Sequence, residues 1–179
     1  MDEIVKAALK KWPNVPACCG WLALDARGDW YMRDERVQAA GPFPQVKGSR
    51  ISHGKLREFI ERNYEVDAQG GWYFQNGPQR VYVELEAAPL VIGVERSAQA
   101  PSGFAWRTHT ERAVPQIDVM LLDEAGRLFA VTPQGLGIVR SLDMDVAADA
   151  LDELGWAPHE VRFADLPRRY GYCLSPQAA

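Results

Sequence analysis

Arginine beside aromatic side chains is the combination in this sequence that best suits ligand binding. Arg80 and Tyr82 alternate along one segment, which places both on the same face of a strand. The segment 106–109 (Trp-Arg-Thr-His) gathers hydrogen-bond donors next to an indole ring. A guanidinium beside an aromatic ring suits an anionic or base-stacking ligand, although a solvated loop with surface ion pairs would have the same composition. The residues that we predict to bind a small anionic ligand are Arg80, Tyr82, Trp106, Arg107, Thr108 and His109.

Signatures of catalysis are missing from the sequence. It contains no G-x-S-x-G nucleophile motif, no P-loop and no G-x-G-x-x-G motif. A hydrolase or transferase that uses His53 or His109 as its general base is the enzymatic alternative. The residues do not decide whether the protein is an enzyme, and we predict no catalytic residue and no cofactor.

The three cysteines, Cys18, Cys19 and Cys173, form a poor disulfide framework, because two of them are adjacent. We expect three reduced thiols in a cytoplasmic protein. A zinc or redox site made from all three is the alternative, but no C-x-x-C spacing and no nearby histidine supports it. We therefore predict no metal.

The composition is that of a folded protein and disfavours binding to nucleic acid polymers, so we predict no such partner. The chain has 179 residues, 47% of them apolar, and a net charge of −4, with a pI near 5.4. A general nucleic-acid binder needs a basic surface. No apolar run approaches the roughly 18 residues of a membrane span, and the first residues lack the apolar core of a signal peptide. A protein partner and self-association both stay open.

Before residue 64 the pattern predicts helix, hairpin, loop and helix. The hairpin covers 20–32 and a surface loop covers 33–50. Ser52 is expected to cap the second helix, which ends near Asn63. The buried face expected for the first helix consists of Ile4, Val5, Ala8, Leu9 and Trp12. That of the second helix consists of Leu56, Phe59, Ile60 and Tyr64.

From Tyr64 to Arg140 the pattern predicts short strands and turns, with a strong hairpin turn at Asn76-Gly77. A third helix follows, for which Asp143 is the expected N-cap and Gly155 the expected C-terminal glycine. A short helical turn and an extended tail complete the chain.

One local pattern occurs three times: an apolar residue, Asp, two free positions, Gly, one free position and two large apolar residues. The three copies are 24–31, 66–73 and 122–129. We interpret each copy as a hairpin corner, in which the Asp accepts backbone hydrogen bonds and the Gly takes a left-handed conformation. The second and third copies match over a longer stretch at an offset of 56 residues, which predicts two three-stranded meanders and an internal duplication.

Several of these segments resemble uncharacterised proteobacterial families of domains of unknown function. The resemblance is carried by 25–31, 55–60, 72–74, 81–90 and 106–108. It implies a duplicated α+β core, a C-terminal half similar to a pleckstrin-homology-like barrel, and a signalling or ligand-sensing role with a nucleotide-like ligand between the domains. The families establish no functional residue that can be carried over.

Together, these observations predict an α+β protein of antiparallel β-meanders and a few helices. We expect an N-terminal helix-hairpin-helix domain over 1–63 and a β-rich, pleckstrin-homology-like domain with a C-terminal helix over 64–179. The leading hypothesis is a non-catalytic ligand-sensing or signalling protein that binds a small anionic ligand at an inter-domain groove. The alternative is a protein–protein adaptor with an exposed strand edge in the region 80–95.

Overall fold

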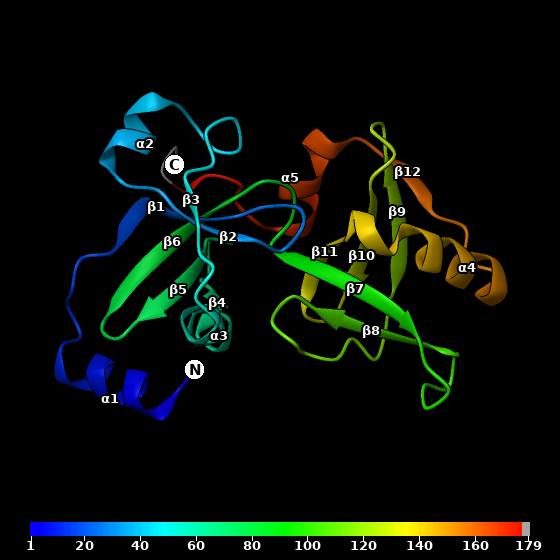
Figure 1. Cartoon of the computed structure of the whole chain (residues 1–179), viewed down its shortest axis with the longest axis horizontal. Helices are drawn as coiled ribbons and strands as arrows, with labels where there is room; N and C mark the ends of the chain where they lie inside the picture. Colours follow the sequence, from blue (N-terminus) through cyan, green and yellow to red (C-terminus); the bar gives the residue numbers. More distant parts are fainter. Residues whose placement is uncertain (177–179) are drawn as a thin grey trace. The chain divides into compact units, whose positions relative to one another are not determined.

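The computed structural model describes residues 1–176 and has the expected α+β architecture, built on two six-stranded sheets (Figure 1). Its backbone divides into two compact units. Unit 1 contains Met1–Asp25, Asp29–Ala87 and the chain from Gly171 onward, and unit 2 contains Ala26–Gly28 and Ala88–Tyr170.

The sheet of unit 1 has the strand order β3-β2-β1-β6-β5-β4. Its strands are β1 (Cys18–Leu24), β2 (Trp30–Met32), β3 (Ser49–Arg50), β4 (Tyr64–Val66), β5 (Trp72–Asn76) and β6 (Gln79–Leu85). Its helices are α1 (Glu3–Lys11), α2 (Glu35–Ala40) and α3 (Gly54–Arg62). The buried Ile60 of α3 packs this helix onto the sheet, where Phe59 and Phe74 meet edge to face.

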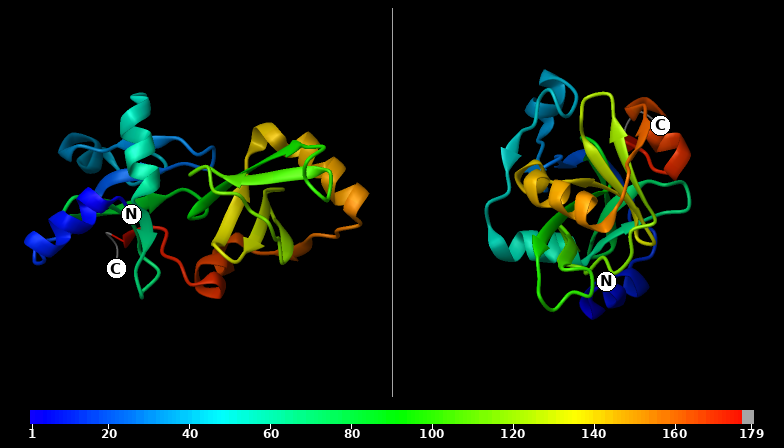
Figure 2. Two further views of the ribbon diagram at one scale, coloured as in Figure 1. Left: turned by 90° about the horizontal axis from the view of Figure 1, so that it is seen from below. Right: turned by 90° about the vertical axis from the view of Figure 1, so that its right-hand side faces the viewer.

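The sheet of unit 2 has the strand order β12-β9-β10-β11-β7-β8. Its strands are β7 (Leu90–Arg96), β8 (Phe104–Thr108), β9 (Val119–Asp123), β10 (Leu128–Thr132), β11 (Gly135–Val139) and β12 (His159–Val161). Its helical segments are η1 (Ser141–Asp143), α4 (Met144–Leu154), η2 (Phe163–Asp165) and α5 (Leu166–Tyr170). Helix α4 covers one face of this sheet (Figure 2), and its Ala147 and Ala150 are buried in the core of the unit.

The two sheets share a plan that explains the internal repeat. In unit 1 the meander β4-β5-β6 pairs in parallel with the first strand of the hairpin β1-β2. In unit 2 the meander β9-β10-β11 pairs in parallel with the first strand of the hairpin β7-β8. Strands β5 and β10, and the starts of β6 and β11, lie at the predicted offset of 56 residues. Both meanders are therefore confirmed, but the parallel pairs make each sheet mixed.

The parallel pairs also bear on the domain boundary and on the predicted strand edge. The two units divide near Ala87, whereas the predicted boundary follows residue 63. The prediction lacked the pairing of β6 with β1, which local sequence patterns do not reveal. The adaptor's exposed edge at 80–95 is wrong, since β6 and β7 each have a neighbouring strand on both sides. The pleckstrin-homology-like barrel stays a prediction.

All three repeated segments form the predicted hairpin corner, which we call the Asp–Gly corner. In each, Oδ1 of the Asp accepts a hydrogen bond from the backbone N–H four residues later, at 2.8–3.0 Å. The backbone N–H of the Asp donates to the carbonyl of that same residue. The φ angles of the three glycines are positive, at 89°, 82° and 74° for Gly28, Gly70 and Gly126. The Asp–Gly corners therefore shape the backbone.

Several local expectations need correction. The segment 33–50 contains helix α2, which Asp34 caps by accepting from the N–H of Val37. His53, not Ser52, caps α3, because its Nδ1 accepts from the N–H of Leu56. Asp143 makes no cap bond to α4, since its carboxylate accepts from the N–H of Val94.

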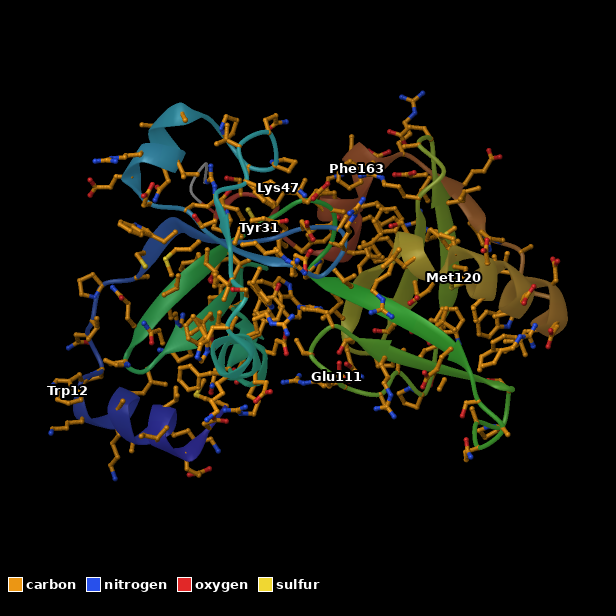
Figure 3. The ribbon with its side chains drawn as sticks, in the orientation of Figure 1. Trp12, Tyr31, Lys47, Glu111, Met120 and Phe163 are labelled. Carbon is orange, nitrogen blue, oxygen red and sulfur yellow. The ribbon has the colours of Figure 1, made fainter. Side chains whose placement is uncertain are left out.

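Helix α1 buries less than its pattern predicted. Only Val5 is buried, while Ile4 and Trp12 are exposed, and Trp12 lies at the outer end of the helix (Figure 3). Gly155 ends α4 in the left-handed conformation, as predicted. No helix in residues 1–176 combines the length and the apolar character that crossing a membrane requires.

Candidate functional site

The predicted ligand-binding residues belong to two different strands. Arg80 and Tyr82 lie on β6 of unit 1, and Trp106, Arg107 and Thr108 lie on β8 of unit 2, with His109 directly after it. The two groups therefore belong to different units.

The Arg80–Tyr82 pair is engaged by the second Asp–Gly corner. The Tyr82 hydroxyl donates to Asp67 Oδ2 at 2.7 Å, and the Arg80 guanidinium lies 4.7 Å from the centre of the Tyr73 ring. Burial alone would raise the pKa of Asp67, but the hydrogen bonds from Tyr82 and from two backbone N–H groups lower it overall. The hydrogen bond to Asp67 in turn raises the pKa of Tyr82. This pair stabilises the turn with a protonated phenol and an ionised carboxylate.

The segment 106–109 does not present its donors together. Trp106 and Thr108 are buried, whereas Arg107 is exposed, because side chains alternate along a strand. The Thr108 hydroxyl is used within its own loop, where it accepts from the N–H of Arg112 at 3.2 Å. Of the six predicted residues, the two arginines are the ones with exposed side chains.

His109 is unsuited to general-base catalysis near neutral pH. Its Nδ1 accepts from the backbone N–H of Val91 at 3.1 Å. The backbone N–H of His109 in turn donates to the carbonyl of Val91. Burial lowers the pKa of His109 to about 3. A general base works best with a pKa near the operating pH, so the histidine-dependent alternative loses one of its two candidate residues. His53 is exposed and caps α3.

A charged cluster that the sequence did not suggest surrounds the first Asp–Gly corner. Lys47 donates to Asp25 Oδ2 at 2.9 Å and to Glu86 Oε2 at 3.1 Å, and the Tyr31 hydroxyl donates to Asp25 Oδ2 at 3.1 Å (Figure 3). Burial alone would lower the pKa of Lys47, but these carboxylates raise it overall, and burial raises the pKa of Tyr31. Both side chains hold their protons, so the cluster ties the 41–48 segment to the corner.

No metal centre is found in the described part of the chain. Within residues 1–176 no three histidine, cysteine or acidic side chains lie close enough to hold an ion. Cys18, Cys19 and Cys173 are free thiols, and burial raises the pKa of Cys18 and of Cys19. A thiol with a raised pKa is a weak nucleophile.

Unit 1 contains an apolar groove of about 540 Å³ between α3 and the sheet, which we call the α3 groove. Buried apolar side chains from both the sheet and the helix form its floor. They are Leu22, Ile51, Ile60, Phe74 and Val81. Around them, large apolar side chains stay in contact with solvent: Trp21 is 41% exposed, Met32 50% and Leu56 37%.

The polar groups of the α3 groove are few and uncharged. They are the thiol of Cys18, the indole N–H of Trp21 and the side-chain amides of Asn76 and Gln79, two residues that pair at the β5–β6 turn. Gln79 Nε2 donates to the carbonyl of Pro16 at 3.0 Å, which leaves its amide oxygen to accept from a ligand. No acidic or basic side chain lines the groove along the described chain. An apolar hollow with a few neutral hydrogen-bonding groups is typical of a small-molecule site.

Sequence reasoning missed the α3 groove although it identified part of its wall. The spacing of Leu56, Phe59, Ile60 and Tyr64 predicted a buried stripe. Ile60 and Tyr64 are buried, but Phe59 is half-buried and Leu56 is exposed. Trp21 points out because the β1–β6 register shifts between Cys18 and Leu22, and such an irregularity re-aims side chains. Incomplete coverage of an apolar stripe leaves no local sequence signal.

Comparisons with known proteins give a family for residues 1–177 and a fold shared with one solved structure. The model of the DUF2944 family, described as "Protein of unknown function (DUF2946)", matches residues 1–177. A crystal structure of a DUF1285 family protein from Silicibacter pomeroyi DSS-3 has a TM-score of 0.53 at 14% identity and covers 83% of this chain and 84% of its own. A crystal structure of a DUF1285 family protein from Shewanella baltica OS155 has a TM-score of 0.48 at 18% identity and covers 75% of this chain and 96% of its own. The likeness to the Silicibacter pomeroyi protein shows a shared fold alone. No curated protein matches this chain.

Proposed function

Because this chain belongs to the DUF2944 family, whose description names no function, we propose a role from the geometry: it is a binding protein whose α3 groove takes a small, largely apolar, uncharged molecule. The observation that carries the proposal is the set of solvent-exposed Trp21, Met32 and Leu56 side chains around a buried apolar floor. Apolar surface in water is costly, and a ligand that covers it gains about 25 cal/mol for each Å² buried.

The lining of the α3 groove selects the chemistry of the ligand. A charged group moved from water into this groove would lose hydration without meeting an opposite charge, so a neutral molecule is favoured. The amide groups of Asn76 and Gln79 suit a hydroxyl or carbonyl group on that molecule. The small anionic ligand predicted from the sequence stays a prediction for Arg80 and Arg107, which lie outside this groove.

Binding, rather than catalysis, is supported by the same lining. The Cys18 thiol is the one titratable group among the described residues that line the groove, and burial raises its pKa. A groove lined in this way can hold and orient a molecule but offers no acid–base pair. We infer a non-catalytic, ligand-sensing role for unit 1.

A thermal unfolding series with 1-octanol, octanoate and octylamine tests this function, because the three probes share a chain length and differ in charge. We expect 1-octanol to raise the unfolding midpoint most, since a ligand at about 100 times its Kd adds about 2.7 kcal/mol to the free energy of unfolding. Leu56→Glu places a carboxylate in the groove and should abolish the shift. Leu142→Glu alters a side chain that is 86% exposed in unit 2 and should retain it.

The two variants also separate specific binding from a general solvent effect of the alcohol. An equal octanol shift in Leu56→Glu and in the unaltered protein would contradict the proposed function, and so would the absence of a shift with all three probes.

A further inference from the structure

A second cavity, of about 620 Å³, lies wholly within unit 2, and its chemistry is opposite to that of the α3 groove. It is bounded by the third Asp–Gly corner and by the segment that runs from β12 through η2 to α5. Strand β12 pairs in parallel with β9, with Glu160 opposite Leu122 and Val161 opposite Asp123, which fixes this segment beside the corner. The fully buried Leu166 lies at the start of α5 and lines the cavity from that side.

The corner and the segment are joined by interactions that hold the cavity walls in place. The N–H of Phe163 (labelled in Figure 3) donates to Glu124 Oε2 at 2.9 Å, and the Arg127 guanidinium lies 4.1 Å from the centre of the Phe163 ring. Arg127 Nε also donates to Asp123 Oδ2 at 2.7 Å, so the charge of Asp123 is matched by a neighbour. The hydrogen bond from Phe163 lowers the pKa of Glu124, which keeps its carboxylate ionised.

Five other charged groups line the cavity and form no ion pairs with one another. They are the carboxylates of Glu124, Glu160 and Asp165 and the guanidiniums of Arg162 and Arg169. None of the five makes an ion pair with any residue in the described chain. Opposite charges that share a cavity without pairing leave both signs available to a ligand.

We propose that this cavity binds a small zwitterion that carries one carboxylate and an excess of ammonium or guanidinium groups, of the kind found in basic amino acids. Arg162 and Arg169 would hold the ligand carboxylate, because a guanidinium fork matches the geometry of a carboxylate. The three acidic side chains would face its cationic groups. Their excess of one negative charge over the arginines favours a ligand with net positive charge. This inference goes beyond the proposed function, since it concerns another unit and another chemistry.

Isothermal titration calorimetry of the full chain with L-arginine, agmatine and succinate tests the proposal. L-Arginine carries both signs of charge, agmatine is the same molecule without the carboxylate, and succinate carries only carboxylates. We expect L-arginine to bind most tightly, with an affinity that falls as salt is added.

The variant Arg169→Ala should weaken L-arginine about tenfold and should not weaken agmatine, because only L-arginine offers a carboxylate to that side chain. Arg168→Ala is the matched control, since Arg168 is the preceding exposed residue of α5 and does not line the cavity. Asp165→Asn should weaken L-arginine and agmatine alike. Both arginines are exposed, so these variants should retain the fold, which an unchanged thermal midpoint would confirm.

The proposal would be overturned by the absence of heat with L-arginine at low salt. It would equally be overturned if Arg168→Ala weakened L-arginine as much as Arg169→Ala, or if succinate bound as tightly as L-arginine.

Discussion

The hydroxyl of Tyr82 donates a 2.7 Å hydrogen bond to Oδ2 of Asp67, while Oδ1 of the same carboxylate accepts from the backbone of its Asp–Gly corner. The two carboxylate oxygens have the same separate uses in the other two corners. Oδ2 of Asp25 accepts from Tyr31 and Lys47, and Oδ2 of Asp123 accepts from Arg127. One oxygen thus shapes the turn, and the other accepts from a side chain, which comes from another segment for Tyr82 and Lys47 and from the repeated segment itself for Tyr31 and Arg127.

Tyr82→Phe should lower the free energy of unfolding by about 2 kcal/mol, because it removes a hydrogen bond to a charged group. Tyr73→Phe is the matched control, since Tyr73 lies opposite Tyr82 on β5 and its hydroxyl has no hydrogen-bond partner among residues 1–176. Urea unfolding measures both variants. Equal losses in the two would show that the Asp67 bond contributes nothing of its own.

Two glycines at the same corner position should respond differently to alanine. At Gly126 the added methyl group meets no atom within 4 Å, so Gly126→Ala should cost only the backbone strain, about 1 kcal/mol. At Gly70 the methyl group would overlap the carbonyl oxygen of Gly171, so Gly70→Ala should cost more than about 3 kcal/mol. Similar unfolding free energies for the two variants would contradict this packing of the C-terminal segment against the corner.

Burial of His109 should make the protein less stable in mild acid. The unfolded chain takes up a proton on this residue near its ordinary pKa of 6.5, whereas the folded chain resists protonation until the pH approaches about 3. The free energy of unfolding should therefore fall as the pH drops below 6.5, by up to about 1.4 kcal/mol for each pH unit from this group.

His109→Gln should remove that contribution to the slope of stability against pH, and denaturant unfolding between pH 6.5 and about 4.5 measures it. His159→Gln makes the same substitution at an exposed position of β12 and is the comparison variant. A slope that His109→Gln does not alter would mean that the histidine is protonated equally in both states.

Alanine substitutions at two residues of α3 should differ in their cost to stability, because one residue belongs to the core and the other to the groove. Ile60→Ala should cost about 3 kcal/mol, because it leaves a cavity under α3, whereas Leu56→Ala should cost less than about 1 kcal/mol. Thermal or urea unfolding compares the two. A loss at Leu56 as large as that at Ile60 would indicate that Leu56 belongs to the core.

The sequence was most informative where structure depends on neighbouring residues. The Asp–Gly corners, the turn at Asn76-Gly77 and the left-handed Gly155 were predicted because each is decided by a few residues in a row. The parallel pairing of β6 with β1 joins segments far apart in the sequence, and no local pattern encodes it.

The candidate site was harder to predict for a related reason. The sequence predictions favoured arginine beside aromatic rings, but Tyr82 binds Asp67 and Trp106 is buried. The α3 groove depends instead on how much of Leu56 the sheet leaves uncovered, which is a property of the assembled unit. Charged side chains such as Glu160 and Arg169 come together only through the pairing of β12 with β9.

The most direct measurement of the proposed function is an NMR experiment that detects contacts between bound 1-octanol and methyl groups of the protein. We predict intermolecular cross-peaks to the methyl groups of Met32 and Leu56, which line the α3 groove, and none to those of Leu142. Cross-peaks to Leu142 of the same intensity, or none to Met32 and Leu56 under saturating probe, would contradict it.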